Sequence, residues 1–252
     1  MAATADPARR PLRNSVVLIV GILVLWELAW LVVGDVALRS PWQTLRFTVH
    51  LVQTDFFWQH LTNTAYAFAL ALLIAVVCGL VIGFALGLHR LSAEAVEPML
   101  VSLYSIPKIT LYPILLLTFG LGMSAKVAFG AIHGVIPVVL FTMNAIRTMK
   151  PVYYKTARVM RLPRSTLIRR IILPAAAPEI FSGLRIGFAL TLLGVLIGEM
   201  FASQRGLGFL IVNAIDLHDI SRMLAVTLLL AFFSIAASVV LLAIDRRLHG
   251  VT

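Results

Sequence analysis

Charged residues and cysteine are scarce in this sequence. Only 13% of its 252 residues are Asp, Glu, Lys or Arg, whereas about a quarter is usual in a soluble domain. Cysteine occurs once, at Cys78, so no internal disulfide can form. None of the four lysines belongs to a Gly-x-x-x-x-Gly-Lys-Ser/Thr motif, which is absent. The composition excludes an ordinary soluble domain, and the missing phosphate-binding loop places any ATP hydrolysis on another chain.

Apolar residues, in contrast, make up 60% of the sequence. A helix needs about 20 mostly apolar residues to cross a hydrocarbon core of about 30 Å, because its backbone groups find no water there. Six segments qualify, so we predict an all-α polytopic membrane protein with six transmembrane helices, preceded by a cytoplasmic tail of residues 1–14. The predicted spans are Ser15–Val33, Tyr66–Leu88, Val101–Leu121, Val127–Ile146, Leu184–Ala202 and Met223–Ile244.

Basic residues near the ends of spans predict the orientation, because Lys and Arg resist translocation across the membrane. The first 14 residues carry three arginines and one aspartate, and the residues after Ile244 carry two arginines and one aspartate. Both termini are therefore predicted to be cytoplasmic. The segments 34–65 and 203–222 are close to charge-balanced and are predicted to lie outside.

The segment of residues 147–179 differs from the other connections, because it holds eight basic residues against Glu179 alone. Its apolar residues recur at helical spacing, which predicts two short amphipathic helices, divided at Pro163 and closed by Pro174. One interpretation is an orientation signal that lies on anionic lipid headgroups. We favour the other, a docking element for a cytoplasmic partner.

The stretch Lys155-Thr-Ala-Arg-Val-Met-Arg161, followed by Ile171-Ile-Leu-Pro174, resembles the cytoplasmic signature of bacterial ABC importer permeases of the binding-protein-dependent (type I) family. The family pattern begins Glu-Ala-Ala, has Gly four residues later, and ends Ile-x-Leu-Pro after a spacer of nine. The spacing matches fully and the residues match in part. Lys155, Thr156 and Arg161 stand where the family has Glu, Ala and Gly, and Leu162-Pro163 could supply the break that Gly normally provides.

Two other stretches resemble the branch of this family that serves nitrate, sulfonate and taurine uptake. They are Ser105-Ile-Pro-Lys-Ile-Thr-Leu-Tyr-Pro113 with Phe119-Gly-Leu-Gly122, and Glu199-Met-Phe-Ala-Ser-Gln-Arg-Gly-Leu-Gly208. The resemblance covers residues 60–250, which we predict to form the permease core with five spans. It implies the type I permease fold and the function of a permease subunit, without enzymatic activity, in an ATP-binding-cassette importer of the bacterial inner membrane.

The resemblance also implies the partners. These are two ABC ATPase subunits that bind ATP and Mg, a periplasmic or extracellular solute-binding protein, and a second permease copy, either identical or closely related, with a homodimer preferred. Membrane lipid surrounds the chain, and we expect no nucleic acid, no metal and no cofactor of its own. The residues assigned to ATPase coupling are Lys155, Thr156, Ala157, Arg158, Val159, Met160, Arg161, Leu162 and Pro163, with Ile171, Leu173 and Pro174 at the end of the loop.

Ionisable residues inside the spans are candidates for the translocation path, since each costs about 2.5–3.5 kcal/mol on insertion scales. Lys108, between two prolines, is a candidate for attracting an anionic substrate; the alternative is that it reaches to lipid headgroups near the cytoplasmic end. For His133 we favour a packing role, and for Glu199 pairing with a neighbouring span. The path candidates are Lys108, Tyr112, His133 and Glu199.

Small residues form a stripe along the second span, where Ala71, Ala75, Gly79, Gly83 and Gly87 recur every four positions. This spacing places them on one helix face and predicts close packing against another span.

Three alternatives remain on the sequence alone. An ion-gradient-driven secondary transporter or channel is one, although the two halves of the chain show no evident similarity. An intramembrane enzyme is another, although the sequence has neither a His-Glu-x-x-His nor a Gly-x-Ser-x-Gly motif. The third concerns the solute, for which we favour a nitrate-, sulfonate- or taurine-like anion over a cationic or neutral vitamin precursor.

Overall fold

The computed structural model describes residues 9–249, and within this range the chain forms helices and no strand. In chain order the elements are α1 (Arg9–Val33), α2 (Pro41–Val52), α3 (Asp55–Gly87), α4 (Arg90–Ser105), the 3₁₀ turn η1 (Lys108–Leu111), α5 (Tyr112–Phe119), α6 (Met123–Arg147), α7 (Pro151–Val159), α8 (Arg164–Leu167), the π-helical turn η2 (Ile168–Ile172), α9 (Leu173–Ala202), α10 (Leu207–Asp216) and α11 (Ile220–His249).

Five helices are long and apolar enough to cross a membrane: α1, α3, α6, α9 with the turns before it, and α11. The pair α4 and η1–α5 supplies a sixth if it is counted as one broken span, and its two parts meet at 89°. The predicted span Val101–Leu121 is therefore broken within the chain and is not a single straight helix. Pro107 lacks a backbone N–H and holds Ile106 in an extended conformation, with ψ of 134°.

Helices α1 and α3 begin before the predicted spans that they contain. The predicted tail of residues 1–14 lies partly outside the described residues, and the part from Arg9 onward belongs to α1. Helix α3 begins at Asp55 rather than Tyr66, where the Thr54 hydroxyl accepts a hydrogen bond from the N–H of Phe57 at 3.4 Å.

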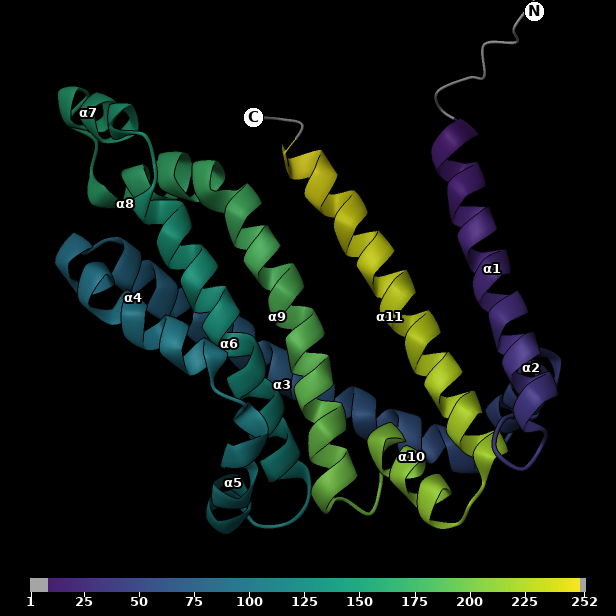
Figure 1. Ribbon diagram of the computed structural model, residues 1–252. Coiled ribbons are helices and arrows are strands. Elements are labelled where there is room, and N and C mark those ends of the chain that lie inside the picture. Colours follow the sequence, from purple (N-terminus) through teal and green to yellow (C-terminus); the bar gives the residue numbers. More distant parts are fainter. Residues whose placement is uncertain (1–8, 250–252) are drawn as a thin grey trace, which may run out of the picture.

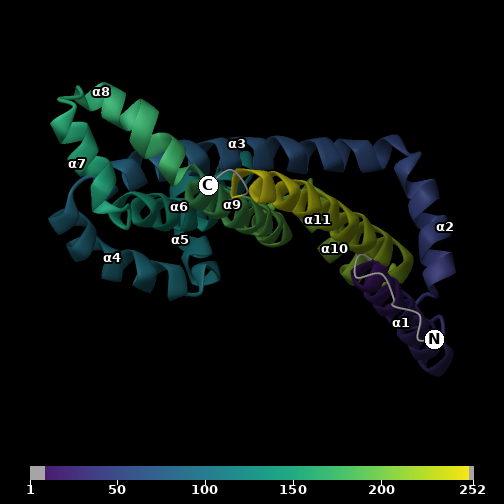
Figure 2. The ribbon, with the colours of Figure 1, turned by 90° about the horizontal axis from the view of Figure 1, so that it is seen from above.

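The core consists of α6 packed between α3 and α9 (Figures 1 and 2). The predicted stripe on α3 is buried along its whole length and faces α6. A Cβ atom built on Gly79 would lie 2.6 Å from Val138, and one built on Gly83 would lie 2.6 Å from Thr142. The prediction of close packing is confirmed, because only residues without a larger side chain allow the two backbones to approach this far.

The prediction that Pro174 closes the second short helix is wrong. Helix α8, the turn η2 and α9 follow each other without a gap, so the chain stays helical through Pro174 into the fifth span. The π-helical hydrogen bonds of η2 shift the bonding pattern by one residue, and the missing N–H of Pro174 falls in the first turn of α9. The second half of the basic segment is therefore the start of a long helix.

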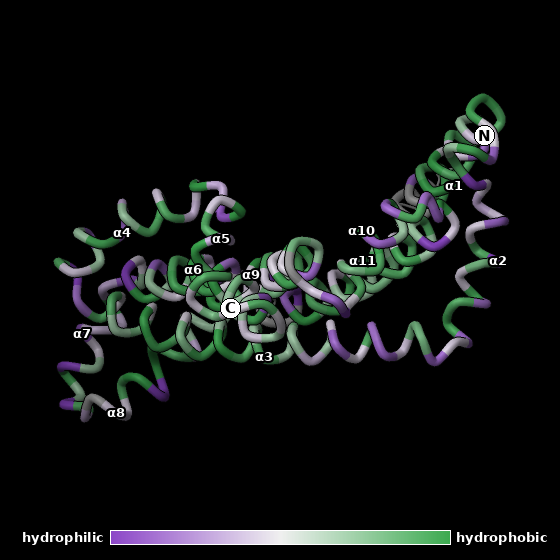
Figure 3. The backbone as a smooth tube through the Cα atoms, turned by 90° about the horizontal axis from the view of Figure 1, so that it is seen from below, coloured by the Kyte–Doolittle hydropathy of each residue, from purple (hydrophilic) through white to green (hydrophobic). Residues whose placement is uncertain are grey.

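The short helices and the ends of the long helices lie at two opposite ends of the molecule. The start of α1, the end of α11 and the α7–α8 segment lie at one end, which we call the α7 end (Figure 1). Helices α5 and α10 and the α1–α2 corner lie at the opposite end, the α10 end. Seen from the α10 end, hydrophilic residues colour α2 and the first turns of α3, whereas the long helices are mostly hydrophobic (Figure 3).

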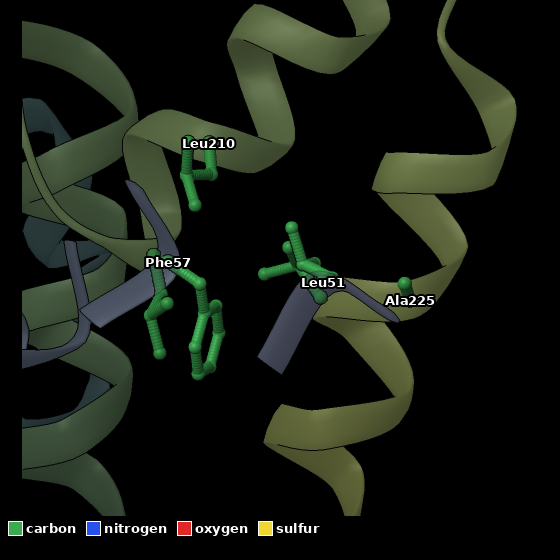
Figure 4. Packing of buried hydrophobic residues seen from close by; sticks show 6 residues of the cluster. Leu51, Phe57, Leu210 and Ala225 are labelled. Carbon is green, nitrogen blue, oxygen red and sulfur yellow. The ribbon is translucent and has the colours of Figure 1, made fainter. Parts of the chain in front are cut away.

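A buried hydrophobic cluster fixes α2, α3, α10 and α11 to each other at the α10 end. Leu51 and Phe57 from the α2–α3 corner belong to one buried cluster with Leu210 of α10 and Ala225 of α11 (Figure 4). This cluster explains why α3 starts early: its first turns are polar on one side but bury Phe57, which is 4% exposed, on the other.

Candidate functional site

The coupling segment, residues 150–163, is docked on the ends of α6 and α9 by one face of α7. Ala157 is 4% exposed, and the Tyr154 hydroxyl donates to the backbone oxygen of Ile146 at 3.4 Å. Burial raises the pKa of Tyr154, so the phenol stays protonated and remains a donor. The buried residues beneath are Ala145, Ile146, Ile172, Ala176 and Ile180. The position of α7 is thus tied to the end of α6 by a hydrogen bond, and to the cluster shared by α6, η2 and α9 by the packing of Tyr154.

The opposite face of α7 is free. Val159 is 83% exposed and Met160 63% exposed. Lys155, Arg158 and Arg161 are also exposed, and none of them forms an ion pair with another described residue. Apolar side chains surrounded by unpaired cations are suited to bind a protein surface with an apolar groove and acidic rim.

The turn that ends α7 depends on Arg161. Its φ is +50°, in the left-handed region that favours glycine. The N–H of Arg161 donates to Arg158 O at 3.1 Å and the N–H of Leu162 donates to Ala157 O at 3.0 Å, which together form a Schellman motif. The helix thus ends before Leu162-Pro163, so the break comes from Arg161 itself, at the position where the family pattern has Gly.

We therefore expect Arg161→Gly to raise the free energy of unfolding by about 1 kcal/mol, because glycine adopts this conformation without the strain of a Cβ atom. Arg161→Val should lower it, because a β-branched side chain tolerates this region least. Thermal unfolding of the purified chain in detergent measures both. Equal midpoints for the glycine and valine variants would contradict the assignment of strain to this turn.

A buried ion pair joins α6 to α9 at the α10 end. Lys126 is 2% exposed and Glu199 is fully buried, and the Lys126 Nζ donates to Glu199 Oε1 at 3.1 Å. Lys126 also donates to Asn63 of α3 and to the backbone oxygen of Arg205, the latter at 3.3 Å. The Thr64 hydroxyl contacts both carboxylate oxygens of Glu199, at 3.0 and 2.8 Å. Three spans therefore meet at one satisfied charge pair.

The turn between α9 and α10 is held by the same network. The N–H of Gly208 donates to Glu199 Oε2 at 3.0 Å, and the N–H of Leu207 donates to the Thr64 hydroxyl at 2.8 Å. Glu199 therefore caps the N-terminus of α10, where a negative charge is favoured. Gly206 has φ of +124°, and a Cβ atom there would collide with the Glu199 carboxylate. The Gly-Leu-Gly sequence is needed for this close approach.

Lys126 is missing from the residues predicted from the sequence, whereas the expected pairing of Glu199 with a neighbouring span is present. Lys126 directly precedes the apolar run that begins at Val127, so it lies outside the predicted span Val127–Ile146. A signal did exist. Consecutive spans run in opposite directions, so the start of the fourth and the end of the fifth meet at one end, where Lys126 and Glu199 carry opposite charges.

The four path candidates do not share one cavity. The Tyr112 hydroxyl donates to Gly198 O at 2.6 Å, and His133 Nδ1 lies 2.8 Å from Phe129 O. Both side chains are buried, and both pack edge-on against the ring of Phe129. With Glu199 in the ion pair, these three residues have partners within the protein. Only Lys108 borders open space.

Lys108 lies at the bend between α4 and α5, beside a cavity of about 680 Å³ between α3, α4 and α6. Its Nζ donates to Tyr104 O at 3.1 Å and lies 5.0 Å from the centre of the Tyr104 ring. Among the described residues that line the cavity, Lys108 is the one with a charge; most others are apolar, such as Ile74, Leu103 and Ile132. The arrangement gives one cation at the edge of an apolar space.

A second ion pair links the end of α6 to the bent span. Arg147, the last residue of α6, contacts Glu97 of α4 at 2.5 Å, and the two side chains are 27% and 30% exposed. Nearby on α4, Arg90 pairs with Glu94 of the same helix at 2.8 Å. Of these two pairs, only Arg147–Glu97 joins different elements. The His, Cys, Asp and Glu side chains within residues 9–249 form no group of three that could hold a metal.

Comparison with known proteins agrees with this architecture. Residues 75–250 match the family model described as "Binding-protein-dependent transport system inner membrane component". The taurine transport system permease protein TauC of Escherichia coli (strain K12) is 28% identical over 96% of this chain and 93% of its own length. The putative aliphatic sulfonates transport permease protein SsuC of Bacillus subtilis (strain 168) is 27% identical over 81% of this chain and 75% of its own.

Two further proteins are similar to this chain. The formylaminopyrimidine transport permease protein ThiX of Halalkalibacterium halodurans is 29% identical over 75% of each chain. A solved structure of the MetNI methionine ABC transporter in an inward-facing conformation aligns with a TM-score of 0.65 and 18% identity, covering 82% of this chain and 97% of that one; it supports the fold. Because the family model covers more than half of the chain, the chain belongs to the family of binding-protein-dependent transport system inner membrane components, as a multi-pass permease subunit of an ABC importer whose ATPase is a separate subunit.

Proposed function

We propose that this permease imports a small anion, of the nitrate, sulfonate or taurine kind, and that the exposed face of α7 is where a separate ATPase binds. The observation that carries the docking proposal is α7 itself: it is fixed to α6 and α9 on one face and presents unpaired cations and apolar side chains on the other. The family membership does not support a gradient-driven transporter or an intramembrane enzyme.

The proposed orientation places the α7 end in the cytoplasm and the α10 end outside. Two observations support it. The basic residues of the coupling segment lie at the α7 end, and the first described turn of α1 and the last of α11 lie at that same end (Figure 1). We further propose an assembly of two such chains, preferably identical, with two ATPase subunits that bind ATP and Mg and one external solute-binding protein.

The docking proposal predicts that Arg158→Glu with Arg161→Glu abolishes capture of the co-expressed ATPase and lowers uptake at least tenfold, because two attractive charges become repulsive. The matched comparison is Arg158→Glu alone against Arg205→Glu, a reversal of an exposed arginine at the α10 end, because each changes the net charge by the same amount. Co-purification from detergent measures capture. The proposal fails if the Arg158→Glu variant retains the ATPase as well as the Arg205→Glu variant does.

The substrate proposal rests on Lys108 at the edge of the apolar cavity. Lys108→Gln should lower uptake of an anion about tenfold or more, because a charge-assisted hydrogen bond is lost, whereas Lys108→Arg should keep most of it. Taurine, an aliphatic sulfonate, nitrate and formylaminopyrimidine are the probes, in vesicles that contain the full importer. Formylaminopyrimidine is included as a probe because the relative ThiX is a formylaminopyrimidine transport permease. Uptake that is equal in the glutamine variant and the unchanged protein would exclude Lys108 from the path.

A further inference from the structure

Helix α2 has three distinct faces. It begins at Pro41 behind a capping box, in which the Ser40 hydroxyl and the Gln43 side chain satisfy each other's backbone N–H groups. One face is buried against α11, through Thr44, Thr48 and Leu51. The second face is apolar but exposed: Trp42 is 71% exposed, Leu45 47% and Val49 55%. The third is polar and carries Gln43, Arg46 and His50. An exposed apolar face beside a basic one is typical of a helix that lies in a membrane interface.

The polar face borders a small basic cavity of about 360 Å³, lined by Arg39, Gln43, Arg46, His50 and Ser221, with Phe47. The Arg39 guanidinium is oriented by two partners: its Nε donates to the Ser221 hydroxyl at 3.1 Å, and it lies 3.5 Å from Asp35. The indole N–H of Trp30 donates to Asp35 at 2.8 Å and lowers the pKa of that carboxyl, so Asp35 offsets the charge of Arg39.

Arg46 and His50 have no such partner. None of the ion pairs between described residues includes either side chain. The cavity therefore presents uncompensated positive charge together with hydroxyl, amide and imidazole groups, which suits a phosphate or another oxyanion.

An apolar groove lies on the other side of the same helix. A cavity of about 530 Å³ lies between α1, α2 and α11. Most of its lining is apolar, such as Leu23, Val24, Leu45 and Leu228, and Glu27 is the ionisable residue among the described residues that line it. Trp26 and Trp42 stand at its border. The groove is far larger than the gaps of a packed core, and within this chain α1 has no buried residue in its spanning window.

The tryptophans mark the depth of this region in the bilayer. All four in the chain lie between residues 26 and 58, in the last three turns of α1, in α2 and in the first turn of α3. The Trp26 indole donates to Arg39 O at 2.9 Å and the Trp58 indole to Val52 O at 2.8 Å. Tryptophan collects at the boundary between hydrocarbon and headgroups, so the basic cavity lies at the level of lipid phosphates.

We propose that the α1–α2 corner binds an anionic phospholipid. Its phosphate contacts Arg46, His50 and Arg39, and its acyl chains lie along Trp42, Leu45 and the groove beside α1. A soluble docking protein would need the cations but not the apolar face, and a free oxyanion would need only the cavity. A second copy of this chain would use the apolar face, but with a net charge of +10 it is not attracted to the basic cavity. The combination of both surfaces on one short helix favours the lipid.

The test uses the full chain in vesicles of phosphatidylcholine with and without phosphatidylglycerol, followed by solubilisation and mass spectrometry of the retained lipid. Phosphatidylglycerol should be enriched over its share in the vesicles. Arg46→Gln should reduce this enrichment about fivefold, the effect of one basic residue at an anionic surface. Leu45→Gln should also reduce it. Arg205→Gln, which removes an exposed cation of the same end away from α2, should leave it unchanged.

Three results would overturn the proposal. The first is equal enrichment in the Arg46→Gln variant and the unchanged protein. The second is protection against thermal unfolding by inorganic phosphate in detergent that Arg46→Gln removes and Leu45→Gln does not, which would indicate a free-oxyanion site. The third is unchanged lipid retention in the Arg46→Gln variant together with loss of ATPase stimulation by the external binding protein, which would make the cavity a protein contact.

Discussion

We expect Lys126→Met to lower the free energy of unfolding by about 3–5 kcal/mol, the usual cost of removing one partner from a buried ion pair. The substitution keeps the length of the side chain but leaves the Glu199 carboxylate, which is fully buried, without a cation. It also removes a donor to Asn63 and to the backbone of Arg205. Thermal or denaturant-induced unfolding of the purified chain in detergent measures the effect.

Two further variants separate charge from packing. Lys126→Met combined with Glu199→Gln should recover most of the loss, because the glutamine still accepts from Thr64 and Gly208 and no charge stays unpaired. Lys155→Met, which removes an exposed lysine, should change stability by less than about 0.5 kcal/mol. A loss below about 1 kcal/mol for Lys126→Met would mean that the pair contributes little to the fold.

Reversing one charge of the Arg147–Glu97 pair should uncouple ATP hydrolysis from uptake. Under the proposed function, closure of the ATPases moves α7, and Arg147 is four residues before α7 begins. Its partner Glu97 lies on α4, the helix that leads to the bend at Pro107 and to Lys108. Arg147→Glu or Glu97→Arg alone should therefore lower uptake about tenfold while ATPase activity is retained, a coupling within the range found for contacting residues.

The double reversal, Arg147→Glu with Glu97→Arg, restores an ion pair of opposite direction and should recover most of the uptake. The pair Arg90–Glu94 is the matched control, because it has the same chemistry on the same helix but joins no second element. Reversing either of its charges should leave the ratio of uptake to ATP hydrolysis unchanged. If the double reversal behaves no better than the single variants, the pair does not carry the coupling.

The close packing of α3 against α6 could be predicted from local patterns in the sequence. The α3 stripe was predictable because a period of four and the absence of side-chain volume both act within one helix, and they have one structural meaning in lipid. The break at Pro107 was signalled by its ring, but the angle between α4 and α5 is set by what α5 packs against. The early start of α3 depends on the burial of Phe57 in one cluster with Leu210 of α10, which no local pattern contains.

Within the candidate site, only the positions specified by the family pattern could be predicted from the sequence. The position of Arg161 followed from the family spacing, but its left-handed conformation follows from the Schellman hydrogen bonds and overrides the preference of an arginine. The prediction that Pro174 ends a helix failed, because the π-helical turn before it allows the helix to continue through this residue. Lys126 has meaning only beside Glu199, 73 residues away in the sequence.

The bend at Pro107 places the Lys108 ammonium group between two acceptors: a backbone carbonyl of α4 and, under the proposed function, the transported anion. The last carbonyls of α4 have no helical partner beyond the break, and Lys108 donates to one of them, Tyr104 O, which also places a cation at the negative end of the helix. Under the proposed function, an anion arriving from the cavity shares the ammonium with that carbonyl, because a lysine ammonium has three N–H donors. The partial negative charge at the end of α4 opposes the anion and so weakens its attraction to Lys108. Weak binding suits a transported solute, because tight retention midway would slow every cycle.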